Sequence, residues 1–272
     1  MEFLKCEINV KETFLSAQPI TFYASYSSGT LDIPFYGGEV RVRQAKGGIL
    51  FDSNSKKGSE FVKTTFRIRD NIKEIYRKIS TDKVINDAIR KYRGLRVTLN
   101  DPWIAAMLFT ISQFNNVKRI SLIAKRLRLR FGEEVEGIEG SIRTLPGYES
   151  ILRLREMELK DIGLGFRSKY LLNVAKWFEE NYYKGFERQS YETIKSELME
   201  IKGIGEKVAD CIALTGFGKL EAFPIDTWMS RAMERYYGIR KTREMHEYAK
   251  AAWKEFAGYA QQYIYHYARN NL

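Results

Sequence analysis

A glycine-centred string at residues 198–211 constrains the fold more than any other part of the chain. It reads LMEIKGIGEKVADC, with helical apolar spacing on both sides of Gly203 and Gly205. Glycine permits a positive φ and lets another backbone approach closely, and Ile204 between the glycines can pack against both flanking helices. The string therefore predicts two short helices joined by a tight turn, with free backbone amides at the start of the second helix.

Those amides and the helix dipole together form a phosphate site that needs no side chain. Contact of this kind is independent of base sequence, which suits a protein that scans DNA. The net charge of +11 and the sequence pI of about 9.4 also favour a polyanionic partner, either nucleic acid or an anionic membrane surface. No stretch has the about 18 apolar residues that cross a bilayer, and the N-terminus has no apolar signal core, so we expect an intracellular protein with no membrane partner.

Metal chemistry through side chains is not expected. The only cysteines are Cys6 and Cys211, and the only histidines are His246 and His266. This set is too small for a four-cysteine zinc site or an iron–sulfur cluster. We therefore expect no required cofactor, and we expect a monomer.

The hydrophobic period changes near residue 71. Before it, short aromatic and β-branched segments between glycine turns predict an antiparallel sheet of about five or six strands. The predicted strands include residues 20–23, 31–36, 39–44, 49–51 and 61–68. After it, helices are predicted over residues 82–92, 103–114, 117–131, 150–154, 156–162, 167–182, 191–199, 207–215, 226–237 and 243–270.

This order predicts an α+β fold with two parts. Residues 1–98 form a β-rich N-terminal domain with a flanking helical segment, and residues 99–272 form a larger all-α domain. The helix predicted from Trp103 to Phe114 is apolar nearly all round, so we expect it to lie in the helical core.

The hairpin string resembles the helix-hairpin-helix of DNA glycosylases, and residues 222–227 (AFPIDT) resemble the Gly/Pro-Asp loop that completes the signature of that superfamily. The resemblance implies a base-excising enzyme whose Lys207 attacks the sugar C1′, expels the damaged base and forms a Schiff base that permits β-elimination. It also implies that Asp226 assists departure of the base, and that Gly203, Gly205 and Val208 contact the DNA backbone.

Both catalytic candidates also have an ordinary structural interpretation. Lys207 lies in the first turn of a helix, where the positive helix end and partial burial disfavour the ammonium form, and a nucleophile requires a neutral amine. The alternative is a solvated surface lysine. Asp226 is equally suited to capping the helix that begins at Thr227, and one carboxylate can serve both purposes.

Further residues resemble the eukaryote-type 8-oxoguanine glycosylases. Phe166 and Arg167 match a loop whose aromatic residue wedges into DNA and whose arginine contacts the estranged cytosine, and Arg119 matches a second cytosine-side arginine. Phe114 occupies the place of the asparagine that fills the gap left by the flipped base in that family, and Asn116 follows it at the DNA.

The same resemblance implies a pocket for the flipped base. Gln261 would bond its Watson–Crick edge, Tyr265 and Cys211 would pack on its two faces, and the Ala17 carbonyl would meet the N7 hydrogen of 8-oxoguanine. The alternative is that the tyrosine and the cysteine are only buried core side chains. Trp228 departs from the histidine usual in the family.

Two more implications follow from the superfamily. Its hairpin often holds a monovalent cation through main-chain carbonyls, here those of Met199, Ile201 and Ile204. With only two cysteines, the chain has too few ligands for an iron–sulfur cluster, which excludes the iron–sulfur branch of the superfamily.

The favoured hypothesis is an 8-oxoguanine glycosylase with AP lyase activity, acting on double-stranded DNA that contains a damaged base. One alternative is a glycosylase of the same fold for alkylated bases such as 3-methyladenine. The other is a non-catalytic helix-hairpin-helix protein that only binds DNA.

Overall fold

The N-terminal part of the chain is an antiparallel sheet with helices on one side. The computed structural model describes residues 1–183 and 185–272. Five strands lie in the order β1-β5-β4-β3-β2. Their bounds are β1 Glu2–Lys5, β2 Ser25–Ser27, β3 Thr30–Phe35, β4 Gly38–Ala45 and β5 Gly48–Ser53.

Strand alternation explains which face of this sheet is buried. Val40 and Val42 of β4 pair with Ile33 and Leu31 of β3, and all four side chains are fully buried. Arg41 between the two valines points away from this core, as the two-residue period of a strand requires. The sheet therefore has its own small core.

Two predicted strands are helices instead. Residues 20–23 belong to α2 (Pro19–Tyr23), and most of residues 61–68 belong to α3 (Gly58–Thr65); a further helix, α1 (Val10–Leu15), precedes them. Pro19 at the first helical position favours α2, and Ile20 and Phe22 are both buried. In α3 and just beyond it, Val62 and Phe66 lie four residues apart and both enter the core of the sheet. A short apolar segment fits the period of a strand as well as the period of a helix, and its packing against the rest of the protein decides which one forms.

The rest of the chain is mostly helical, which confirms the predicted fold class. The helices are α4 Ile72–Ile79, α5 Lys83–Lys91, α6 Pro102–Ser112, α7 Val117–Phe131, α8 Tyr148–Leu152, α9 Glu156–Asp161, α10 Arg167–Asn181, α11 Tyr191–Met199, α12 Glu206–Thr215, α13 Thr227–Tyr237, α14 Thr242–Trp253 and α15 Ala257–Arg269, with 3₁₀ turns at Phe186–Arg188 and Lys254–Phe256. A two-stranded hairpin of β6 (Glu134–Glu136) and β7 (Ser141–Arg143) was not predicted. Within the described residues, no helix combines the length and hydrophobicity of a membrane span.

The single helix predicted over residues 243–270 is two helices, α14 and α15. The chain turns at Lys254, whose φ is +47°. Trp253 just before the turn is almost fully buried, stacks on Phe223 at 5.5 Å and donates from its indole nitrogen to the Thr81 hydroxyl at 3.0 Å. This anchor redirects the chain so that α15 enters the helical core.

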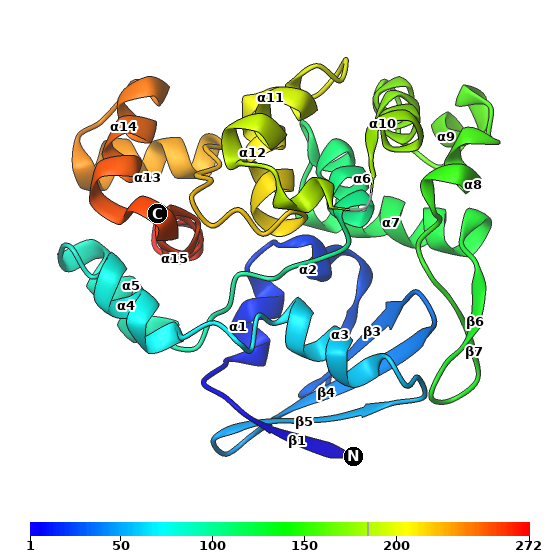
Figure 1. Cartoon of the computed structure of the whole chain (residues 1–272), viewed down its shortest axis with the longest axis horizontal. Coiled ribbons are helices and arrows are strands. Elements are labelled where there is room, and N and C mark those ends of the chain that lie inside the picture. The colour runs from blue at the N-terminus through cyan, green and yellow to red at the C-terminus, as the bar shows by residue number, and fades with distance from the viewer. Residues whose placement is uncertain (184) are drawn as a thin grey trace.

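Helix α12 occupies the middle of the helical part, where it packs against α6 and α11 (Figure 1). Helix α15 lies beside α4, α5 and α13, and the α1–α2 segment lies between the sheet and the helices. The Gln262 side chain of α15 donates to the Ser16 carbonyl at 2.7 Å. The segment between α1 and α2 therefore meets α15 beside α12, and this junction forms the candidate site.

Candidate active site

The predicted hairpin is present, with α11 and α12 joined by residues 200–205. Gly203 has a φ of +106°, and a Cβ there would lie 2.3 Å from the Tyr170 ring, so any other residue would be strained and would have to displace that ring. Gly205 has an ordinary extended backbone, and a Cβ there would meet nothing within 4 Å. One glycine therefore serves the fold, while the other leaves open space at the start of α12.

The start of α12 has free backbone donors. Within the described part of the chain, the amides of Glu206 and Lys207 have no hydrogen-bond acceptor. The Val208 amide donates to the Gly205 carbonyl at 3.0 Å, and the Val208 side chain is buried. The phosphate-binding capacity predicted for the hairpin thus lies in the two amides before Val208.

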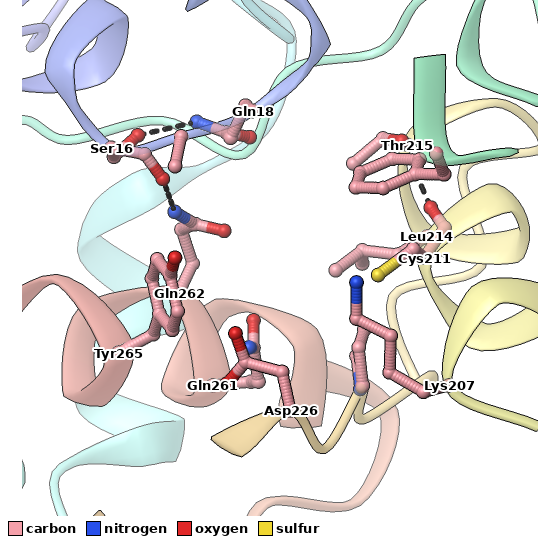
Figure 2. Close-up of a pocket in the computed structure, with 13 residues that line it drawn as sticks. Ser16, Gln18, Lys207, Cys211, Leu214, Thr215, Asp226, Gln261, Gln262 and Tyr265 are labelled. Carbon is pink, nitrogen blue, oxygen red and sulfur yellow. Dashed lines mark hydrogen bonds between the residues drawn. The ribbon is translucent and has the colours of Figure 1, made fainter. Parts of the chain in front are cut away.

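Lys207 points into a pocket. Its side chain is half-buried, and its Nζ lies 5.4 Å from the centre of the Phe109 ring. Figure 2 shows Nζ beside the Cys211 sulfur. Within the described residues, no carboxylate lies in ion-pair range of Nζ. The amine therefore faces the cavity without a fixed counterion, unlike an ordinary surface lysine.

Asp226 faces the same cavity. One carboxylate oxygen accepts a hydrogen bond from the Met229 amide at 2.8 Å, so Asp226 is the N-cap of α13. Figure 2 shows its carboxylate next to Gln261, across the cavity from Lys207. The structural and the chemical interpretations of this residue are therefore compatible.

The pocket encloses a cavity of about 60 Å³ and brings together every residue predicted for catalysis and base binding. Helix α12, the Asp226 loop, α15 and the α1–α2 segment each contribute to its wall (Figure 2). The lining residues are Ser16, Ala17, Gln18, Phe109, Lys207, Cys211, Leu214, Thr215, Pro224, Asp226, Gln261, Gln262 and Tyr265.

Helix α12 contributes a buried thiol to one wall of the pocket, and α15 contributes a phenol and an amide to the opposite wall. Cys211 is almost fully buried, and burial raises the pKa of its thiol to about 11, so the sulfur is neutral at physiological pH. On α15, burial likewise raises the pKa of Tyr265 to about 12. Within the described residues, the Gln261 side-chain amide has no hydrogen-bond partner, although Gln261 is only 7% exposed. An unpaired amide in a pocket is suited to bonding the edge of a bound ligand.

Ala17 closes the third wall with an unusual backbone. Its φ is +58°, which is rare for a residue with a side chain. Gln18 fixes the loop, because its side-chain amide donates to the Ser16 hydroxyl and the Arg96 carbonyl, each at 2.9 Å. Within the described residues, the Ala17 carbonyl accepts no hydrogen bond, so it remains available to a ligand.

Outside the pocket, the residues predicted to contact DNA lie on two loops beside the hairpin. Phe114 and Phe166 are both exposed, and their ring centres are 6.2 Å apart. Asn116 caps α7 by accepting from the Arg119 amide at 3.0 Å, and the Arg119 side chain is exposed. Helix α6 ends two residues earlier than predicted, at Ser112, which frees this loop.

Arg167 is directed toward the neighbouring loop in the free protein. Its side chain is buried, and its guanidinium donates to the carbonyls of Gln113 and Phe114 at 2.6 and 2.8 Å. Loss of hydration lowers the pKa of this guanidinium, and the nearby Arg119 charge contributes in the same direction. Arg167 therefore joins the two loops, while the Arg119 side chain is exposed.

Two further predicted features are Trp228 and the carbonyls of the hairpin. Trp228 is half-buried, and the Arg231 guanidinium lies 5.7 Å from its ring centre, so a cation is close to the place where the family has histidine. At the hairpin, the Ile201 carbonyl accepts from the Ile204 amide at 2.9 Å.

Sequence reasoning missed Phe109, Thr215 and Gln262 in the pocket. Phe109 lies on a helix that is apolar all round, so its sequence offers no signal. Gln262 is a polar residue in the buried stretch of α15, and such a residue indicates either a buried hydrogen bond or a site.

The comparisons with known proteins agree with this geometry. The family "HhH-GPD superfamily base excision DNA repair protein" matches residues 108–257, more than half of the chain. The "Probable N-glycosylase/DNA lyase" of Methanothermobacter thermautotrophicus is 27% identical over 235 residues, which cover 78% of this chain and 75% of that protein. The "N-glycosylase/DNA lyase" of Saccharomyces cerevisiae is 28% identical over 64% of this chain, and the match spans half of the yeast protein.

A solved structure described as "Structure of MBOgg1 in complex with low affinity DNA ligand" superimposes with a TM-score of 0.91 at 26% identity and covers 99% of both chains. The likeness therefore extends through the sheet as well as the helices. On the family match, the hairpin and the lysine–aspartate pocket, this chain belongs to the HhH-GPD superfamily of base excision DNA repair proteins.

Proposed function

We propose that this protein removes 8-oxoguanine from double-stranded DNA and then cuts the backbone as an AP lyase. The observation that carries the proposal is the single pocket in which the Lys207 amine, the Asp226 carboxylate and the Gln261 amide meet. The names of the relatives, which are N-glycosylase/DNA lyases, support the same pairing of activities.

The pocket residues support a two-stage reaction. A bond forms between the Lys207 nitrogen and C1′ as the glycosidic bond breaks, and the bond's electron pair leaves with the base, which takes up a proton. Asp226 stabilises the positive charge that develops on the sugar. The C1′–O4′ bond then breaks, O4′ takes up a proton that the nitrogen loses, and a C1′=N Schiff base forms. Removal of a C2′ proton from it expels the 3′ phosphate oxygen.

The free acceptor and donor groups favour an oxidised purine. 8-Oxoguanine carries a hydrogen on N7, whereas guanine has a lone pair there, and the Ala17 carbonyl offers an acceptor without a partner. The Gln261 amide can both donate to and accept from the Watson–Crick edge. The Ala17 carbonyl and the Gln261 amide are therefore the two groups that we expect to recognise 8-oxoguanine.

The two alternatives have less support in the pocket. A glycosylase for alkylated bases that activates water needs only the aspartate, and a DNA-binding hairpin needs neither residue. Lys207 directed into the cavity is redundant in both cases.

The test is base release from duplexes that contain 8-oxoguanine, guanine or 3-methyladenine, with and without borohydride. We expect release of 8-oxoguanine and a trapped protein–DNA adduct with that duplex alone. Release of 3-methyladenine without strand cutting, or binding with no release from any duplex, would replace this proposal with one of the alternatives.

We also propose that the Met199, Ile201 and Ile204 carbonyls hold a monovalent cation next to a DNA phosphate. The Ile201 carbonyl already accepts one hydrogen bond, but a carbonyl oxygen has a second lone pair. DNA affinity at constant ionic strength should therefore be higher in potassium than in lithium chloride, and equal affinities would contradict the site. Size-exclusion chromatography tests the monomer that we propose.

A further inference from the structure

Gln262 lines the base pocket, but the proposed reaction gives it no role. It follows Gln261 on α15, is only 6% exposed, and donates from its side-chain nitrogen to the Ser16 carbonyl at 2.7 Å. Within the described residues, its side-chain oxygen accepts no hydrogen bond. Figure 2 shows this oxygen directed into the pocket, away from Ser16. An amide with one half paired and the other half facing a cavity indicates contact with a ligand.

The hydrogen bond to Ser16 fixes the orientation of the Gln262 amide. A carbonyl oxygen can only accept, so the amide nitrogen must face Ser16 and the amide oxygen must face the opposite way. Turning the amide over would set two oxygens against each other at 2.7 Å. Ser16 is itself fully buried, and its hydroxyl donates to the Thr13 carbonyl at 2.8 Å. The pocket therefore contains a fixed acceptor rather than an amide that can turn to suit its ligand.

The same contact restrains the Ala17 carbonyl, which is next in the chain. Ala17 has a φ of +58°, and such a backbone persists only where its surroundings hold it. Gln18 anchors the chain just after it, and Gln262 anchors the chain just before it from α15. One turn farther along α15, the His266 Nε2 lies 2.8 Å from a Glu12 carboxylate oxygen and ties α1 to the same helix. The Ala17 carbonyl and the Gln262 oxygen are thus two acceptors held by one set of contacts.

Fixed acceptors distinguish the two bases that this enzyme must separate. The O6–N7 edge of guanine presents two acceptors and no donor. In 8-oxoguanine, N7 carries a hydrogen, which is the only donor on that edge and can be shared by two acceptors in a three-centre bond. Undamaged guanine would instead turn its N7 lone pair toward the acceptors, and a buried acceptor left without a donor costs free energy. A wall of acceptors therefore binds the damaged base and rejects the normal one.

We propose that Gln262 is a specificity-determining residue, which adds a second fixed acceptor to that of Ala17 and so excludes undamaged guanine from the pocket. This inference rests on the proposed function, because it requires that 8-oxoguanine enters this pocket. Gln261 cannot make the distinction, since the Watson–Crick edge that it is expected to bind is the same in guanine and 8-oxoguanine. The choice between the two bases therefore falls to the acceptors beside Ser16.

The experiment compares the affinities for two duplexes that differ only in 8-oxoguanine or guanine at one position. A Lys207→Gln background prevents reaction, and the ratio of the two affinities is the readout. Gln262→Met keeps the length of the side chain but removes its donor and its acceptor, so the preference for 8-oxoguanine should fall about tenfold, as expected for one hydrogen bond. A purely structural defect would weaken binding to both duplexes equally and leave the ratio unchanged.

A second variant replaces the acceptor with donors. In Gln262→Lys, the amine can keep a hydrogen bond to the Ser16 carbonyl while its other hydrogens face the pocket. The preference should fall further than in Gln262→Met, because the N7 lone pair of guanine then meets a donor, whereas the added charge raises the affinity for both duplexes alike. Gln44→Met is the matched control, since the Gln44 amide on β4 donates to the Gly48 carbonyl at 3.0 Å in the sheet. Its ratio should equal that of the parent.

An unchanged ratio in the two Gln262 variants would overturn the inference and leave the proposed function intact. Equal affinities of the Lys207→Gln parent for the two duplexes would count against both, because the pocket would then not distinguish the bases. Melting temperatures show whether each variant folds, and either Gln262 variant alone carries the test. With Lys207 restored, the ratio of 8-oxoguanine release to guanine release should fall by the same factor as the affinity ratio.

Discussion

The base pocket and the α6–α7 and α9–α10 loops both adjoin the hairpin, but they are built differently. The pocket takes Lys207 and Cys211 from one helix and Gln261 and Tyr265 from another, each pair one helical turn apart. The two loops present Phe114 and Phe166, and they are held together by hydrogen bonds from Arg167 to backbone carbonyls. In the pocket, regular structure sets the geometry. In the two loops, one buried guanidinium sets the geometry, so the two regions should respond differently to substitution.

The largest effect in the pocket is expected from Asp226→Asn. Asparagine keeps the N-cap of α13 but removes the charge that stabilises the sugar cation. Excision should fall about a hundred- to a thousand-fold while the melting temperature stays within about 1 °C of the wild type.

Asp226→Ala is the matched variant, because it removes the cap as well as the charge. It should lose activity to the same extent and also about 1 kcal/mol of stability. Equal melting temperatures for Asn and Ala, or full activity in Asn, would contradict the dual role.

The two glycines of the hairpin give the next largest effects and separate fold from binding. Gly203→Ala forces a side chain into the Tyr170 ring at a φ of +106° and should cost about 1–3 kcal/mol of stability. Gly205→Ala meets no atom in the free protein and should leave the melting temperature unchanged, yet weaken DNA binding because its methyl group occupies the space before the free amides. Thermal unfolding and a DNA titration of both variants check this contrast. A stable Gly203→Ala or an unfolded Gly205→Ala would contradict it.

The smallest effect is a slow reaction of the pocket thiol. Because burial raises the pKa of Cys211 from 9.0 to about 11, its thiolate fraction at pH 8 should be about a hundredfold below that of a free thiol. In Cys6→Ser, which leaves only Cys211, labelling by a thiol reagent at pH 8 should be correspondingly slow. Rapid labelling of the folded protein would show that the pocket is more open than described.

The same shift sets the sign of a stability change. The unfolded thiol ionises near its ordinary pKa of 9.0, while the folded thiol stays neutral until about pH 11. Stability should therefore fall between these pH values, and replacement of Cys211 by serine should remove that part of the decline.

The pocket residues were predicted from the resemblance of their motifs to the glycosylase family, and the structure places Cys211 one helical turn after Lys207 and Tyr265 one turn after Gln261. The Gly203 turn was equally readable, since a positive φ there is a local requirement. Residues 20–23 were misassigned because the sheet and the helical core, both distant in sequence, decide their conformation. The short apolar segment itself suits a strand as well as α2.

The α6–α7 and α9–α10 loops were the least predictable region. The acceptors of Arg167 in the α6–α7 loop lie 53 and 54 residues before it, and an arginine in a loop offers no local sign that it is buried. Family register suggested that Arg167 would face DNA, but it could not reveal that two carbonyls of the neighbouring loop already occupy the guanidinium.

The most direct test of the central claim is to locate the covalent bond between the protein and DNA. Borohydride reduction during reaction with an 8-oxoguanine duplex, followed by proteolysis and mass spectrometry, should place the adduct on Lys207 alone. Lys207→Gln should form no adduct while binding the duplex with an affinity within about threefold of the wild type, because the hairpin amides remain. An adduct on Lys202 or Lys195, or an undiminished adduct in Lys207→Gln, would contradict the assignment of Lys207 as the nucleophile.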